Sequence, residues 1–143
     1  MFDDDGIREN DKPARRLRVL LAEDNVVNQN LAVRILEKMG HEVVIAENGK
    51  LAVAQLQKGR FDLVLMDIHM PEMDGYAATE AIRRWESVRG RHTPIVAVTA
   101  NTMASSRDQY LKKGMDGYVA KPISAEAVAR AIRFVFEKIA EHP

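Results

Sequence analysis

Short apolar runs alternate with longer amphipathic stretches from Leu17 onward. Runs of this length that are bounded by polar residues predict β-strands. Two of them, Leu63–Met66 and Ile95–Val98, are apolar at every position, which is typical of strands buried on both faces of a sheet. The predicted strands are Leu17–Ala22, Glu42–Ala46, Phe61–Met66, Ile95–Val98 and Gly117–Ala120.

Between the strands, apolar residues recur every three or four positions, a period that predicts amphipathic helices. The residues expected on their buried faces are Leu31, Ile35, Leu36 and Met39; Leu51, Ala52 and Leu56; Ala77, Ala81, Ile82 and Trp85; Val128, Ile132, Val135 and Ile139; a weaker pattern runs from about Thr102 to Lys113. Gly40, Gly59 and Gly114 follow helical patterns, and we expect them to end helices in the left-handed conformation. Ser124 is expected to cap the last helix.

Strands that alternate with helices favour an α/β fold, a doubly wound, five-stranded parallel sheet with helices on both faces. We expect one domain over residues 17–140. Residues 1–16 are polar and contain Gly6 and Pro13, so we expect a flexible tail or linker there. In open sheets of this kind, ligands bind beyond the carboxyl ends of the strands. The residues that follow each strand are therefore the candidates for chemistry.

Charged and hydroxyl side chains follow four of the predicted strands. They are Glu23 and Asp24, then Asp67, then Thr99, then Lys121. Taken alone, each is more often a helix cap, a turn former or a solvated side chain than a functional group. Because each follows a different strand at the same edge of the sheet, we expect them to converge in one crevice.

Three carboxylates in one crevice need a counter-charge, since one of them would otherwise stay protonated. Mg²⁺ prefers oxygen ligands and combines one or two carboxylates with carbonyls, waters and phosphate oxygens. We expect Asp24 and Asp67 to bind Mg²⁺ directly, with Mn²⁺ as a substitute. Glu23 is expected to act through water, and the backbone carbonyl of His69 to complete the ligand set.

A magnesium ion beside a lysine and a hydroxyl suits phosphoryl transfer, in which negative charge spreads over the phosphoryl oxygens. We expect the Lys121 ammonium to bind one of these oxygens. The Thr99 hydroxyl and the Ala100 N–H are expected to bind another. Asp67 is then the nucleophile, and its carboxylate becomes an acyl phosphate.

The composition is that of a neutral chain without cysteine. Among 143 residues, 46% are hydrophobic and the formal net charge is zero, which gives no long-range attraction to nucleic acid or anionic membranes. The absence of cysteine excludes disulfides and thiolate metal sites. No apolar run approaches the ~20 residues of a membrane span. We therefore expect no direct nucleic-acid or membrane contact by this segment. The expected location is cytoplasmic.

Four motifs resemble, in order and spacing, those of the receiver domain of two-component signalling, which occurs in response regulators and hybrid histidine kinases. They are L-L-A-E-D-N with Glu23 and Asp24; L-V-L-M-D-I-H-M-P-E-M-D-G with the phosphorylatable Asp67; I-V-A-V-T-A with the switch hydroxyl Thr99; and G-Y-V-A-K-P with the aromatic switch Tyr118 and Lys121. The resemblance covers roughly Leu17 to Lys138. The stretches A-E-D-N-x-x-N-Q and A-V-T-A-N are most similar to the receivers of hybrid sensor histidine kinases.

The resemblance implies a flavodoxin-like (βα)5 fold with strand order 2-1-3-4-5 and a cis Lys121–Pro122 peptide bond. It also implies a phosphorelay, in which a phosphohistidine on a histidine kinase or histidine phosphotransfer domain donates the phosphoryl group. The receiver catalyses this transfer and then slowly hydrolyses its own acyl phosphate. We therefore do not expect a multiple-turnover enzyme from the isolated domain. A histidine kinase is one candidate for the parent chain, and no output domain is expected after Pro143.

The resemblance further implies a switch. Once Asp67 is phosphorylated, Thr99 is expected to move toward the phosphoryl group, and Tyr118 to rotate inward into the vacated space. The face formed by the fourth helix, the fifth strand and the fifth helix would change shape and alter partner binding. This face is also a candidate surface for a homodimer.

Three alternative functions remain open at this point. A phosphohydrolase of the haloacid-dehalogenase type also uses Mg²⁺ and an aspartate nucleophile, but it usually has a second aspartate where this chain has His69. A flavodoxin-like cofactor binder would need a phosphate-binding loop after the first strand, where Glu23 and Asp24 would repel a flavin phosphate. A docking domain that is never phosphorylated would not need the complete acceptor site.

Overall fold

The computed structural model describes residues 16–101 and 103–141. The tail predicted for residues 1–16 therefore lies outside the described residues, except for Arg16. In chain order the elements are β1 (Arg18–Ala22), α1 (Val26–Lys38), β2 (Glu42–Ala46), α2 (Gly49–Lys58), β3 (Leu63–Asp67), α3 (Gly75–Ser87), β4 (Ile95–Thr99), α4 (Ala104–Lys112), β5 (Gly117–Ala120) and α5 (Ala125–Glu141).

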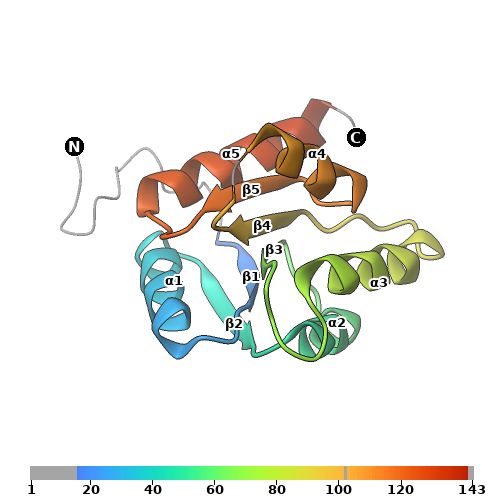
Figure 1. Cartoon of the computed structure of the whole chain (residues 1–143), viewed down its shortest axis with the longest axis horizontal. Helices are drawn as coiled ribbons and strands as arrows, with labels where there is room; N and C mark the ends of the chain where they lie inside the picture. Colours follow the sequence, from blue (N-terminus) through green and yellow to red (C-terminus); the bar gives the residue numbers. More distant parts are fainter. Residues whose placement is uncertain (1–15, 102, 142–143) are drawn as a thin grey trace.

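The five strands form one parallel sheet in the order β2-β1-β3-β4-β5, which confirms the predicted fold class and strand order. Helices α1 and α5 cover one face of the sheet, and α2 and α3 cover the other (Figure 1). Two separate apolar clusters result, one on each face. Within the described part of the chain, no helix is long and apolar enough to cross a membrane.

The central strands β3 and β4 are buried at every position, as predicted from their unbroken apolar runs. Both strands extend one residue further than the apolar runs, so Asp67 and Thr99 belong to the strands themselves. In the parallel register Asp67 lies opposite Val98, and Thr99 lies opposite Ala120. The sheet, rather than a loop, therefore fixes the backbone of both candidate residues.

Four of the residues predicted on buried helix faces are instead exposed: Leu31, Leu51, Ala77 and Ile139. The difference in α3 has a clear cause. Asp74 caps this helix by accepting the Ala77 N–H at 2.8 Å, and Gly75 then faces the sheet. A Cβ at Gly75 would lie 2.3 Å from the Asp67 carbonyl oxygen, so only glycine allows α3 to start this close to β3. The buried face of α3 is consequently turned by about one residue from the prediction, and Ala78 is buried in place of Ala77.

The predicted helix ends are confirmed at three positions and wrong at one. Gly40 and Gly114 have φ values of +95° and +99°, which is the left-handed conformation expected after a helix. The Ser124 hydroxyl accepts the Ala127 N–H at 3.1 Å and caps α5. Gly59 has a φ of −128° because the chain runs from α2 directly into an extended segment.

A buried ionic network ties α3 to the starts of β4 and β5. Glu86, which is 1% exposed, accepts Arg83 Nη1 at 2.6 Å and the Thr93 N–H at 2.7 Å. Arg83 Nη2 donates to Asp116 Oδ2 at 2.8 Å, and the same oxygen accepts the Ile95 N–H. Burial favours a raised pKa for Asp116, but its hydrogen bonds with His92 and with the Ile95 N–H, together with the Arg83 charge, outweigh burial, so the pKa of Asp116 is lowered. The network therefore fixes the end of the sheet opposite the candidate site.

We predict that Glu86→Ala lowers the free energy of unfolding by about 3 kcal/mol, because it removes one of the two carboxylate partners of Arg83 and leaves the Thr93 N–H without its acceptor. The matched control is Glu80→Ala on the same helix, since Glu80 forms a partly exposed ion pair with Lys113 at 3.3 Å. That change should cost less than about 1 kcal/mol. Urea denaturation of both variants provides the measurement, and equal losses would contradict a structural role for the network.

Candidate functional site

Asp67 ends the central strand β3, and its side chain is 3% exposed. Its neighbours in the sheet are β1 on one side and β4 on the other. The residues after β1 therefore lie beside Asp67, as predicted for the carboxyl edge of a parallel sheet. The His69 N–H donates to Asp67 Oδ1 at 3.3 Å, while the His69 side chain is exposed.

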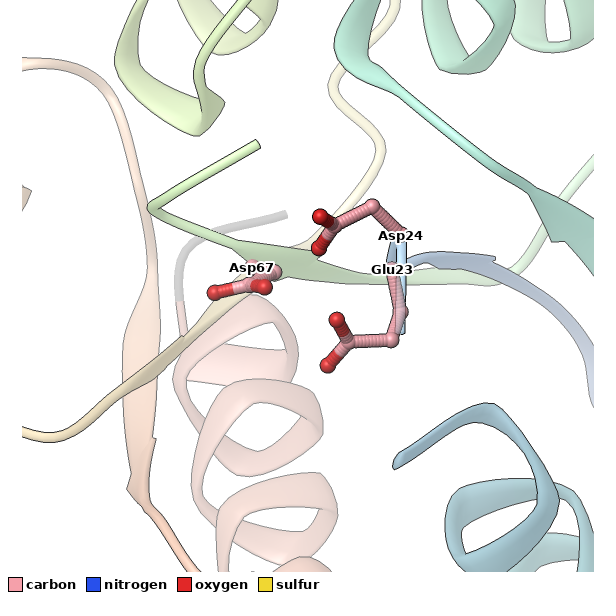
Figure 2. A group of neighbouring side chains, drawn as sticks. All are labelled: Glu23, Asp24 and Asp67. Carbon is pink, nitrogen blue, oxygen red and sulfur yellow. The ribbon is translucent and has the colours of Figure 1, made fainter. Parts of the chain in front are cut away.

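Glu23 and Asp24 follow β1 and bring two further carboxylates to Asp67 (Figure 2). One oxygen from each of the three groups lies within 4.8 Å of the others. Glu23 is buried, and its backbone is held on both sides. Its N–H donates to the Ala46 carbonyl at 3.0 Å, and its carbonyl accepts Gln29 Nε2 at 2.7 Å. Asp24 is exposed, so the acidic cluster opens to solvent on its side.

Lys121 supplies positive charge from β5's carboxyl end. Its Nζ lies 2.9 Å from Asp67 Oδ1 and 3.8 Å from Glu23 Oε1. The following Lys121–Pro122 peptide bond is cis, as the resemblance implies. One ammonium therefore lies against two buried carboxylates, and the predicted convergence of these side chains is observed.

The charge imbalance is visible in Glu23. Burial raises the pKa of Glu23 to about 7, and its hydrogen bond with Asp67 and the Asp67 charge act in the same direction. The Asn25 N–H and the Lys121 charge oppose this shift without cancelling it. A divalent cation among these oxygens would favour the ionised form. The donor set, three carboxylates with one open side, is the kind of site that a hard cation such as Mg²⁺ takes.

Thr99 lies at the end of β4 and is 3% exposed. Among the described residues, its hydroxyl makes hydrogen bonds with Asn101 and Tyr110 rather than with Asp67. Ala100 follows at an exposed position beside the site. Tyr118 lies in β5, is partly exposed, and has the Arg107 guanidinium 5.3 Å from its ring centre.

Two residues near the site were assigned no role by the sequence reasoning. Gln29 is 9% exposed and donates to the Glu23 carbonyl. Its signal in the sequence was a polar residue among the apolar positions of an amphipathic helix. Tyr110 is 3% exposed and holds Thr99. Its signal was a single aromatic residue in a largely polar helix.

Comparison with known proteins gives a family. Residues 19–133 match the response regulator receiver domain family. Sensor protein GacS of Pseudomonas syringae pv. syringae is 49% identical over 120 residues, which is 83% of this chain and 13% of GacS. The chain therefore spans only a small part of the curated kinases that it resembles.

Two solved structures support the same assignment. The receiver domain of the histidine kinase CKI1 from Arabidopsis thaliana, complexed with Mg²⁺ and BeF3−, has a TM-score of 0.80 and 33% identity, covering 90% of this chain and 95% of that one. The receiver of the Saccharomyces cerevisiae response regulator Ssk1, in complex with the histidine phosphotransfer protein Ypd1, has a TM-score of 0.78 and 29% identity, covering 86% and 91%.

The family match, the shared flavodoxin-like fold and the similarity to the receivers of hybrid histidine kinases agree with the acidic cluster at the sheet edge. The chain belongs to the response regulator receiver domain family, the phosphoacceptor domains of two-component phosphorelays.

Proposed function

We propose that Asp67 is the residue of this chain that accepts the phosphoryl group. The observation that carries the proposal is its setting: a buried carboxylate on a central strand, 2.9 Å from the Lys121 ammonium and next to two further acids. A side chain fixed in this way is positioned for in-line attack without further ordering.

In the proposed reaction an Asp67 carboxylate oxygen attacks the phosphorus of a phosphohistidine. A P–O bond forms, the P–N bond breaks, and the leaving imidazole keeps the electron pair and takes up a proton. Lys121 neutralises charge on the phosphoryl oxygens, and the Thr99 hydroxyl and Ala100 N–H bind one of them. Slow attack by water on the acyl phosphate then restores the carboxylate.

We further propose that the acidic cluster binds Mg²⁺ through Asp24, Asp67 and the His69 carbonyl, with Glu23 acting through water. When bound, the ion supplies the positive charge that Lys121 alone does not. Its presence in the CKI1 receiver supports this proposal. Substitution by Mn²⁺ stays a prediction, as does a cytoplasmic location.

The donor would approach along α1, because this helix begins directly after the acidic pair. Its first turn exposes two apolar side chains, with Val26 at 63% and Val27 at 75%. Beside them, a pocket of about 250 Å³ is lined by Leu31, Ile123 and the site residue Lys121, among others. An apolar surface at the entrance to a charged site suits a helix that carries the donor histidine. The Ypd1 complex of a similar receiver supports this choice of partner.

The output of the switch is proposed to be the face made by α4, β5 and α5. Phe134 is 56% exposed on this face. It lines a groove of about 550 Å³ together with Tyr118 and Arg130, among others. A homodimer through this face stays a prediction.

We predict that the chain gains one phosphoryl group when it is incubated with a small phosphodonor and Mg²⁺, and that Asp67→Asn abolishes this gain. Intact-protein mass spectrometry provides the measurement. Asp74→Asn is the matched control, because asparagine also caps helices well and the α3 cap lies outside the acidic cluster. Release of many phosphates per chain would instead favour the phosphohydrolase alternative.

We predict that Asp24→Asn weakens Mg²⁺ binding about tenfold or more, because it removes one anionic ligand. Glu47→Gln is the control, since Glu47 is an exposed acid that follows β2 at the same edge of the sheet. Calorimetric titration with Mg²⁺ measures both variants. Equal affinities in the two variants would show that Asp24 is not a ligand.

We predict that Val27→Glu slows phosphotransfer from phosphorylated Ypd1, used as the probe, about tenfold, because docking would bury a charge. Phosphorylation by a small donor should stay at the wild-type rate, since the site itself is unchanged. Val88→Glu is the control, because Val88 is 81% exposed at the end of α3. Equal slowing by both variants would place the docking surface elsewhere.

A further inference from the structure

Tyr110 connects the switch hydroxyl to α4. This side chain is 3% exposed, and its hydroxyl donates to Thr99 Oγ1 at 2.8 Å. The same hydroxyl also contacts the Asn101 carbonyl oxygen. Because a hydroxyl has one proton, Tyr110 can donate to only one of these acceptors at a time. Thr99 Oγ1 also accepts the Asn101 N–H at 3.0 Å, so Tyr110 and Asn101 together hold the hydroxyl.

The Tyr110 ring also contacts the second switch residue. Its centre lies 6.2 Å from that of Tyr118 in β5, and 6.0 Å from that of Tyr76 in α3. These are contact distances for tilted aromatic pairs. Tyr110 thus touches both residues that the switch requires to move, Thr99 through its hydroxyl and Tyr118 through its ring.

We propose that Tyr110 is a positioning residue of the switch, which holds Thr99 Oγ1 on the α4 side while Asp67 is unphosphorylated. The inference rests on the proposed phosphoacceptor role of Asp67. The Thr99 hydroxyl must leave its hydrogen bond with Tyr110 in order to bind the phosphoryl group. That hydrogen bond therefore favours the unphosphorylated arrangement and lowers the affinity of the site for a phosphoryl group.

Release of Thr99 also frees the Tyr110 hydroxyl to donate to the Asn101 carbonyl alone. The ring is packed against Tyr118, so a shift of Tyr110 changes the space available to that side chain. In this way a change at Asp67 reaches β5 and the α4–β5–α5 face through side chains in direct contact. Tyr110 would set both the ease of phosphorylation and the response of this face.

The test is Tyr110→Phe, which removes the hydroxyl and keeps the buried ring. With Mg²⁺ present, we expect this variant to bind BeF3−, an anion of phosphoryl shape, about 3- to 10-fold more tightly than the wild type, which is the effect of one lost competing hydrogen bond. Titration calorimetry gives the affinity. Tyr76→Phe is the matched control, because it makes the same change on the other ring neighbour of Tyr110, and its affinity should equal that of the wild type.

A double-mutant cycle shows whether the effect passes through Thr99. In a Thr99→Val background, which lacks the hydroxyl, Tyr110→Phe should leave the BeF3− affinity unchanged. In a Thr99→Ser background, which keeps the hydroxyl, the tighter binding should return. A gain that persists with valine, or no gain in the wild-type background, overturns the proposal.

A second measurement does not depend on how well Tyr110→Phe folds. The chain with 3-fluorotyrosine at its three tyrosines gives one ¹⁹F resonance for each, and the Tyr76→Phe and Tyr118→Phe variants assign them. BeF3− should shift the Tyr110 resonance in the wild type but not in Asp67→Asn. A resonance that stays in place overturns the proposal. Failure of the wild type itself to gain a phosphoryl group would instead refute the phosphoacceptor role of Asp67.

Discussion

The structure depends on a shortage of positive charge around two buried carboxylates. Asp67 and Glu23 share the ammonium of Lys121, at 2.9 and 3.8 Å, and both acids are almost completely shielded from water. Three charged groups this close can be held only by a rigid frame, because each would be better solvated apart. The parallel sheet is that frame, since β1, β3 and β5 each deliver one group at the same edge. Burial and the neighbouring Asp67 raise the pKa of Glu23, and the excess of acidic groups makes the cluster suited to a cation.

Local features of the sequence serve this arrangement. The lack of a side chain at Gly75 lets α3 approach the Asp67 backbone, and the Gln29 amide holds the Glu23 carbonyl. At the opposite end of the sheet, Glu86 and Asp116 share Arg83, and each also accepts a backbone N–H. At the candidate site three carboxylates lie around one ammonium, which is the arrangement that a cation would complete.

The fold and the central site residues were predictable because their signals are strong. Unbroken apolar runs identify the central strands, and acidic, hydroxyl and amine groups after successive parallel strands must share one edge. Spacing alone did not predict the exposed sides of α1 and α2. Leu31 and Leu51 fit the helical period, but they lie at the edge of the buried helix face and are exposed. In α3 the buried face was shifted because Gly75 lies close to the Asp67 backbone, a contact that the spacing of apolar residues does not indicate. The hydrogen bond between Tyr110 and Thr99 depends on tertiary packing, so the sequence around either residue does not predict it.

The position of Lys121 and Tyr118 on one element has a consequence for coupling. Both belong to β5 or its immediate end, three residues apart, so the residue beside the proposed acceptor and the proposed switch residue share one strand. Tyr110 adds a second connection, from Thr99 at the end of β4 to the same strand. A partner on the α4–β5–α5 face therefore acts on a strand that also holds the Asp67 counter-charge. By thermodynamic reciprocity, a partner that prefers the phosphorylated arrangement must also stabilise the acyl phosphate. The proposed donor surface on α1 lies on a different element, so docking of a donor and binding of an output partner would not need to compete.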